Sequence, residues 1–222
     1  MIVVCKYFLY FIIYSFIGWL LEVTCKFFEF KRFVNRGFLI GPICPIYGYG
    51  VLIIILLIGT NTSDILSVFL KSILICSILE YFTSFFMEKI FKARWWDYSQ
   101  NRFNINGRIC LETMLPFGIL GTLVVYFIHP NIEKIINLFS QNTIIKISIF
   151  IFIIYLIDNI ISFNVMNKIK NEIKKHKADN TELIRRKVFS WLENNSVLYR
   201  HIKEAFPKFI INNKMLDKMK RK

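Results

Sequence analysis

Four acidic side chains lie inside long apolar runs of this chain. Each lies toward the end of its run that is predicted to face the same side of a membrane. They are Glu22, Glu80, Glu112 and Asp158. A carboxylate in hydrocarbon is costly unless it is paired with a cation or faces water. A layer of such acids therefore predicts a polar pocket that opens toward one side of a membrane. Its acids could bind a cation, carry a proton or contact a polar substrate.

Two arginines stand at a depth that matches these acids. Arg36 begins the second apolar run and Arg108 the fourth, so Glu–Arg pairs would lower the cost of burying both charges. The same pairs could serve only to lock a helix bundle. Glu80 is the best candidate for a functional role, because it lies about eight residues, or about 12 Å, inside its run. The predicted pocket residues are Glu22, Asn35, Arg36, Glu80, Asn106, Arg108, Glu112 and Asp158.

The elements that carry these residues are predicted to be membrane-spanning helices. Of the 222 residues, 55% are hydrophobic, and the mean hydropathy of +0.47 is too high for a soluble domain. A helix needs about 20 apolar residues to cross roughly 30 Å of hydrocarbon. Five segments meet this requirement, so the predicted fold class is an all-α integral membrane protein with five transmembrane helices. These segments cover residues 3–24, 38–58, 65–86, 109–128 and 144–163.

The distribution of charge predicts the orientation of these helices. Lysine and arginine in short loops stay on the cytoplasmic side, and the loops after the first and third spans are rich in both. The loops at residues 59–64 and 129–143 contain only one Lys or Arg between them, Lys134. We therefore expect the N-terminus outside the cell and the C-terminus in the cytoplasm.

The C-terminal part of the chain is strongly basic. Residues 165–222 contain sixteen Lys or Arg and six Asp or Glu, and they contribute +10 of the formal charge of +14. We expect a transmembrane domain at residues 1–165 and a basic, helical cytoplasmic tail at residues 166–222. A basic tail beside a bilayer is attracted to anionic headgroups, so membrane lipid is an expected partner and nucleic acid is not.

Two parts of the chain resemble each other, at about residues 7–58 and 65–128. In each, an acid near the end of an inward helix is followed by a basic loop, an Asn/Arg/Gly turn and an outward helix with Pro and Gly. The pattern predicts two parallel helix-pair repeats with the fifth helix outside the duplication, although chance similarity would give the same pattern. Helix breaks or hinges are expected at Gly41, Pro42, Pro45, Gly48, Pro116 and Gly118.

Motifs of known catalytic chemistry are missing from the sequence. It contains no Walker A sequence, no HExxH and no GxSxG, and the three histidines lie far apart. The five cysteines form no CxxC pair. We therefore expect no catalytic, cofactor-binding or metal site, and no enzyme activity.

Several motifs together resemble a known family. They include residues 14–22 (YSFIGWLLE), 33–39 (FVNRGFL), 41–48 (GPICPIYG), 96–99 (WDYS) and 106–112 (NGRICLE). Over about residues 7–165 the chain resembles the ABC-transporter permease family called type IV, or CmpB-like. The resemblance implies a bacterial cell-membrane protein that works with a separate ATP-hydrolysing subunit.

The leading hypothesis is a permease-like subunit with a polar pocket that faces the cytoplasm. Five spans are few for a transport pathway, so a second copy of the chain or a partner subunit would be required. An alternative is a non-transporting membrane scaffold whose tail recruits cytosolic partners or anionic lipid. An enzyme that acts on lipid headgroups would fit the depth of the acids, but it is the least favoured hypothesis because no recognised nucleophile or metal set accompanies them.

Overall fold

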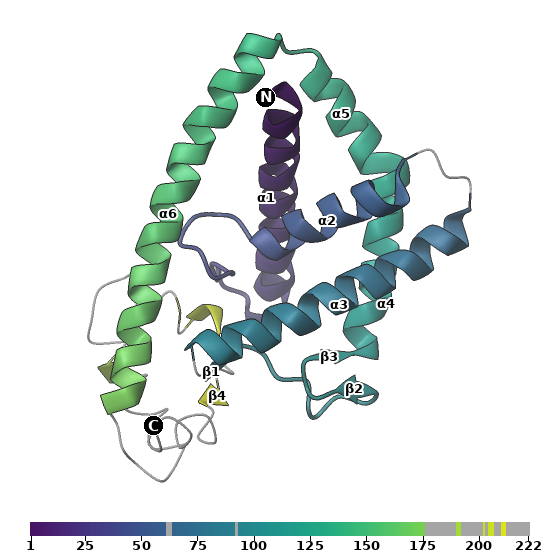
Figure 1. The fold of residues 1–222 in the computed structure, drawn as a ribbon. Helices are drawn as coiled ribbons and strands as arrows, with labels where there is room; N and C mark the ends of the chain where they lie inside the picture. The colour runs from purple at the N-terminus through teal and green to yellow at the C-terminus, as the bar shows by residue number, and fades with distance from the viewer. Residues whose placement is uncertain are drawn as a thin grey trace.

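The structure is a computed structural model that describes residues 1–60, 64–91, 93–175, 190–191, 202, 204–206 and 210–211. It is a helical bundle with short strand pairs at one end (Figure 1). The helices are α1 (Ile2–Phe30), α2 (Pro45–Ile58), α3 (Ile65–Phe91), α4 (Leu111–Leu123), η1 (Val124–Ile128), α5 (His129–Asn137) and α6 (Gln141–Lys175). The strands are β1 (Ala93–Arg94), β2 (Asn104–Ile105), β3 (Ile109–Cys110) and β4 (Ile210–Ile211).

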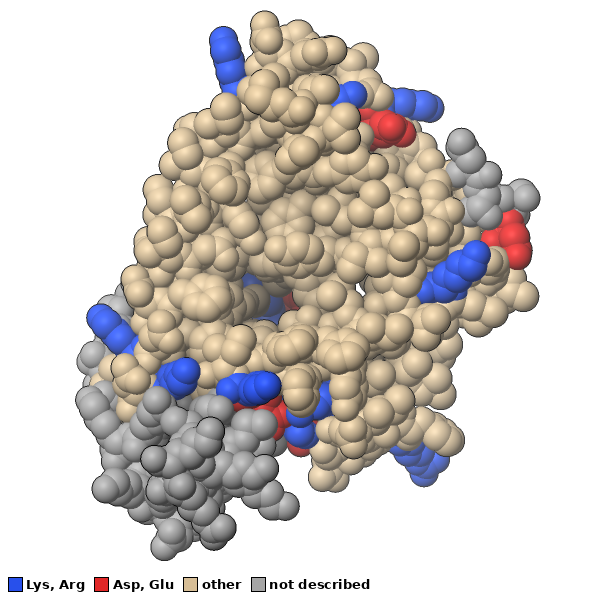
Figure 2. Space-filling view, viewed as in Figure 1, with Lys and Arg blue, Asp and Glu red and all other residues tan. Residues whose placement is uncertain are grey.

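Among the described residues, four stretches of helix are long and apolar enough to cross a membrane. They are Ile2–Phe30, Ile65–Phe91, Leu111–Asn137 and Gln141–Asn171. In Figure 2, charged side chains are sparse along the middle of α6, and large apolar side chains on that helix are exposed. Such a surface suits contact with lipid. The predicted all-α membrane class is thus confirmed.

The second predicted span differs from the expectation. Residues 38–44 are not helical, and α2 covers only the 14 residues Pro45–Ile58. At 1.5 Å per residue this helix is about 21 Å long, which is shorter than the roughly 30 Å of hydrocarbon. Pro42 and Pro45 explain the late start, because proline lacks a backbone N–H and is tolerated only in the first turn of a helix. The prediction of an uninterrupted helix over 38–58 is therefore wrong, and whether this shorter helix serves as a fifth membrane-spanning segment stays a prediction.

The later spans are longer than predicted. α4, η1 and α5 form one helical stretch from Leu111 to Asn137, whereas the prediction placed residues 129–143 in an external loop. α6 runs to Lys175 and so passes without interruption through the predicted domain boundary at residue 165. Beyond Lys175, most of the predicted helical tail falls outside the described residues.

Small residues allow the helices to pair closely. A Cβ added at Gly48 of α2 would come within 3.0 Å of Ser15 and Phe11 of α1, and one at Gly121 of α4 would come as close to Ser72 of α3. α1 therefore packs on α2 and α3 on α4, while α2 also contacts α3 and α6 contacts α1. The two predicted helix pairs thus exist as contacts, and their origin by duplication stays a prediction.

The predicted hinge residues lie in different surroundings in the two pairs. Gly41 precedes α2 in the irregular segment, where its N–H bonds to Asp158. Pro116 lies inside α4, which stays helical from Leu111 to Leu123. Gly118 follows it at a close contact with Phe69 of α3. Only the first pair therefore has a broken helix at the predicted place.

Candidate functional site

Glu22 lies near the end of α1 and has two partners from the segment that follows. The Nε of Arg36 lies 3.4 Å from its Oε2, and the hydroxyl of Tyr47 donates to its Oε1 at 2.8 Å. Tyr47 is the third residue of α2, whose N-cap is Cys44. The predicted pairing of Glu22 with Arg36 is present in the structure.

Glu80 occupies the corresponding place on α3 but has no comparable cation. Its side chain is buried, with 7% of the residue exposed. The hydroxyl of Tyr98 donates to its Oε1 at 3.2 Å, and that of Thr113 to its Oε2 at 3.5 Å. Thr113 is the third residue of α4, whose N-cap is Cys110. Within the described part of the chain, no Lys or Arg forms an ion pair with Glu80.

The two acids lie close enough to interact electrostatically. Glu22 is among the charges that act on Glu80, and each acid also acts on the tyrosine that bonds the other, Tyr47 or Tyr98. Figure 2 shows a hollow near the centre of one face, with basic and acidic side chains visible in its depth. Burial, and then the charge of Glu80, raise the pKa of the Tyr98 hydroxyl, so this hydroxyl remains a donor at neutral pH.

Arg108 does not pair with any of the four predicted acids. Its Nη2 lies 2.6 Å from Oε2 of Glu88, its Nη1 donates to Ser84 at 3.2 Å, and the rings of Tyr81 and Phe85 cover its guanidinium. Arg108 thus forms an ion pair with a glutamate, but the partner is Glu88 and not one of the four predicted acids. Glu88 is only 2% exposed.

Sequence reasoning missed Glu88 because the third span was ended at residue 86. The helix continues to Phe91, so Glu88 lies within it. A usable signal was present: Glu80, Ser84 and Glu88 are four residues apart, which places them on one face of a helix. All three are buried.

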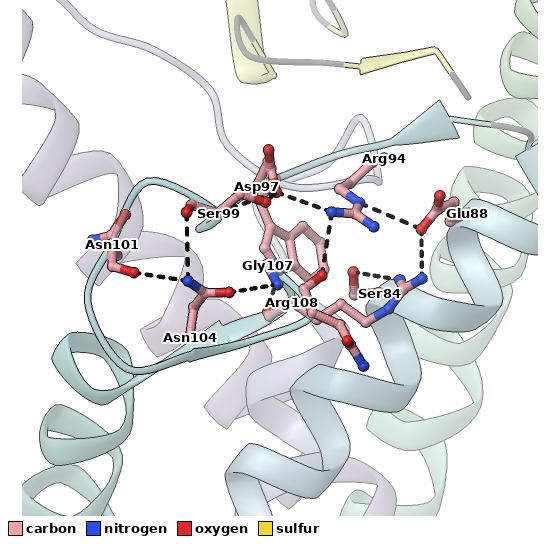
Figure 3. Close-up of polar contacts among 11 residues, drawn as sticks. Ser84, Glu88, Arg94, Asp97, Ser99, Asn101, Asn104, Gly107 and Arg108 are labelled. Carbon is pink, nitrogen blue, oxygen red and sulfur yellow. Dashed lines mark hydrogen bonds and ion pairs between the residues drawn. The ribbon is translucent and has the colours of Figure 1, made fainter. Parts of the chain in front are cut away.

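A chain of ion pairs extends from Arg108 into the loop after α3 (Figure 3). Arg94 lies 3.4 Å from the Glu88 carboxylate and 3.0 Å from that of Asp97, and Ser99 donates to Asp97 at 2.7 Å. Burial alone would raise the pKa of Asp97, but the hydrogen bonds from Ser99 and Arg94 outweigh it and lower the pKa below 3.8. These contacts fix the loop that delivers Tyr98 to Glu80.

Asn106 occupies the turn of the β2–β3 hairpin. Asn106 and Gly107 have φ values of 54° and 65°, and the N–H of Arg108 bonds to the carbonyl of Ile105 at 3.0 Å. Positive φ at both central positions is the requirement of a type I′ turn, which favours Asn-Gly. The Asn106 amide donates to the hydroxyl of Tyr81 at 2.9 Å. Its side chain is exposed, so the residue serves the turn that positions Arg108.

Asn35 and Asp158 hold the irregular segment before α2. Asn35 accepts from the Trp19 indole at 2.6 Å and donates to the Ile40 carbonyl at 2.9 Å. Asp158 of α6 accepts the backbone N–H groups of Ile40 at 3.1 Å and Gly41 at 3.0 Å. Non-helical backbone at membrane depth must find such partners. Both residues are thus engaged in positioning the chain between Glu22 and Tyr47.

Glu112 lies apart from Glu22 and Glu80. It stands in the first turn of α4, where a negative charge is favoured by the helix dipole, and its side chain is exposed. Its partner is the amide of Asn101. The structure therefore brings together Glu22, Arg36 and Glu80 of the predicted set, with Tyr47, Tyr98 and Thr113 as additional members.

His129 is a second residue that sequence reasoning missed. It was assigned to an external loop, but it is 3% exposed and its Nδ1 lies 2.9 Å from the hydroxyl of Tyr14. It directly follows η1, a π-helix of a kind that is frequent at functional sites. Among the described residues, no group of three or more His, Cys, Asp or Glu side chains is arranged to hold a metal ion.

The predicted pocket residues lie inside a matched family model. Residues 9–163 match the family described as "Putative ABC-transporter type IV", and this range is well over half of the chain. The chain belongs to this family. Curated proteins and solved structures give no significant match. As a member of the type IV family, the chain is a multi-pass membrane protein of ABC-transporter type, and all eight predicted pocket residues fall within the match.

Proposed function

We propose that this chain is the membrane-embedded, permease-like subunit of an ABC-type transporter. In this proposal the pocket around Glu22 and Glu80 opens toward the cytoplasm and receives a polar substrate, a cation or a proton. The N-terminus lies outside a bacterial cell membrane, and the basic tail lies inside. The observation that carries the proposal is that each helix pair holds one acid through a tyrosine hydroxyl: Tyr47 donates to Glu22, and Tyr98 donates to the buried Glu80.

The charges of the pocket favour a positively charged ligand or a proton. Arg36 compensates Glu22, whereas the described residues give Glu80 only the hydroxyls of Tyr98 and Thr113 as partners. A buried carboxylate with hydroxyl partners alone is costly while it is ionised. A cation or a proton at Glu80 would remove this cost. In that respect Glu80 differs from Asp158, whose carboxylate is satisfied by backbone N–H groups.

Transport would require further chains. The chain contains no Walker A sequence, and the four candidate spans among the described residues are few for a pathway. A separate ATPase subunit would supply energy, and a second copy or another membrane subunit would complete the pathway. The family assignment supports the separate ATPase subunit.

The first test is extraction of the tagged full-length chain from its native membrane in mild detergent. We expect an ATPase subunit to co-purify, identified by mass spectrometry and by ATP hydrolysis. Absence of any ATPase from complexes that retain their lipid would contradict the ABC-type role, and recovery of other cytosolic proteins alone would favour the scaffold hypothesis.

The second test places Glu80→Gln in the co-purified complex, reconstituted in vesicles. We expect ATP turnover to fall about tenfold or more, since a lost hydrogen bond to a charged group is worth about 1.5–3 kcal/mol and 1.4 kcal/mol equals tenfold. Glu112→Gln is the matched control, because that exposed acid lies outside the pocket. Equal turnover of both variants and the unmodified complex would remove Glu80 from the mechanism.

A further inference from the structure

Part of the C-terminal tail packs against the end of the bundle where α3 stops. Ile202, Ala205 and Phe206 are at most 8% exposed. The Phe206 ring meets Trp95 edge-on, with 4.7 Å between the ring centroids. These tail residues share one buried apolar cluster with Phe91, Trp95, Val165, Met166 and Ile169.

The backbone of the tail also pairs with the loop that carries Tyr98. β4 runs antiparallel to β1, with Ala93 opposite Ile211 and Arg94 opposite Ile210 (Figure 1). This is addition of a strand to an exposed edge, a contact made mainly by backbone groups. The pairing is two residues long, so it supplies few hydrogen bonds. A contact of this size is suited to local opening without unfolding of the bundle.

Arg36 joins this tail segment to the pocket. Its Nη1 donates to the carbonyl of Ala205, and its guanidinium lies over the Phe206 ring, 5.5 Å from the centroid. The Nε of the same group lies 3.4 Å from the carboxylate of Glu22. One planar side chain therefore contacts the tail on one edge and a pocket acid on the other, as a guanidinium with several fixed donors allows.

We infer that Ala205 and Phe206 are positioning residues for the pocket: the docked tail holds Arg36 against Glu22, and release of the tail frees Arg36. The inference rests on the proposed function and adds a means of regulating it. With the tail docked, the charge of Glu22 is compensated and the segment before α2 is fixed. With the tail released, Arg36 is no longer held against Glu22. The negative charge of Glu22 is then no longer compensated by a fixed cation.

Cys44 provides a reporter for this release. It is 5% exposed, and its thiol donates to the carbonyl of Arg36 at 3.7 Å, so it lies directly under the segment that Arg36 anchors. A full-length variant that retains Cys44 as its single cysteine would be placed in nanodiscs and treated with a water-soluble maleimide. We expect slow labelling when the tail is docked.

Phe206→Ala in this background is expected to accelerate labelling of Cys44 about tenfold, which corresponds to a shift of about 1.4 kcal/mol in the docking equilibrium. Phe103→Ala is the matched control, because this loop phenylalanine is 79% exposed and lies outside the apolar cluster. Ile210→Pro is the second variant. It removes a backbone N–H from β4 without changing Ile202, Ala205 or Phe206, so faster labelling is expected here as well.

Labelling at the unmodified rate in correctly folded Phe206→Ala and Ile210→Pro proteins would overturn the inference. If Phe206→Ala does not fold, the rate of Ile210→Pro decides the question alone. Failure of this inference can be told apart from failure of the proposed function, because thiol labelling needs neither substrate nor ATPase. The effect of Glu80→Gln on ATP turnover would stand unaffected.

Discussion

The two helix pairs, α1–α2 and α3–α4, hold an acid by the same local scheme. In the first pair, the hydroxyl of the third residue of α2, Tyr47, bonds to Glu22 at 2.8 Å. In the second pair, the hydroxyl of the third residue of α4, Thr113, bonds to Glu80 at 3.5 Å. This shared geometry supports the proposal of two repeats in parallel orientation.

The pairs differ in where they place the arginine. Arg36 lies against the pocket acid Glu22, whereas Arg108 lies against Glu88, two turns farther along α3 than Glu80. The second arginine thus stabilises the loop, and among the described residues Glu80 has no ion pair with Lys or Arg. The difference teaches that arginines at similar sequence positions can have different tasks. Arg36 compensates the charge of Glu22, whereas Arg108 compensates that of Glu88.

The largest difference between the two pairs is expected when each arginine is replaced and the free energy of unfolding is measured. We expect Arg108→Gln to lower the free energy of unfolding by about 3 kcal/mol, because it leaves the buried Glu88 with one partner fewer. Arg36→Gln should cost only about 1 kcal/mol, because Arg36 and Glu22 are partly exposed. Thermal unfolding in detergent measures both. Equal losses would show that the two arginines have the same structural role.

The close helix contacts of the two pairs should be equally sensitive to an added methyl group. Gly48→Ala and Gly121→Ala would each place a Cβ closer than 3.0 Å to the facing serine, and we expect each to cost about 1–3 kcal/mol, as overpacking does. Gly50→Ala is the control, since its nearest neighbours would lie at ordinary contact distances of 3.6 and 3.7 Å. A large loss for one glycine and none for the other would break the comparison.

A substitution in the loop between α3 and β2 should have the smallest effect on the free energy of unfolding, and this effect should depend on pH. Asp97→Asn is expected to cost about 0.5–1 kcal/mol at pH 7, because Asp97 is a partly exposed partner of Arg94. The pKa of Asp97 is lowered in the fold, so its stabilising contribution is complete above the unfolded value of 3.8 and is lost as the pH falls through the folded value. Melting temperatures of the two proteins should converge below that pH. A constant difference down to pH 3 would contradict this account.

The amino-acid sequence predicted the membrane class and the pairing of Glu22 with Arg36, whereas the functional role of Glu80 stays a prediction. These features follow from local rules: long apolar runs, the cost of a buried charge and the side chains at one depth. Prolines at positions 42 and 45 also gave a sound expectation of a broken helix before α2. What failed was the assumption that an apolar run of sufficient length is helical throughout.

The remaining features depend on contacts between distant segments. Burial of His129 requires Tyr14 of α1, and the placement of Arg36 requires the tail residue Ala205. Neither relation is visible in the spacing of residues. Asp158 was predicted as a pocket acid, but it bonds to the N–H groups of Ile40 and Gly41, which became available because proline prevents a helix there. Its role in a pocket stays a prediction.

A double-mutant cycle tests most directly whether Glu22 and Glu80 share one polar pocket. The free energies of unfolding of Glu22→Gln, Glu80→Gln and the combined variant would be compared with that of the unmodified chain at pH 9. Two like charges in one pocket repel each other, so Glu80→Gln should be more favourable when Glu22 is present, with a coupling of about 0.5–3 kcal/mol. Additive effects, within about 0.3–0.5 kcal/mol, would show that the acids lie in separate environments and would contradict the account.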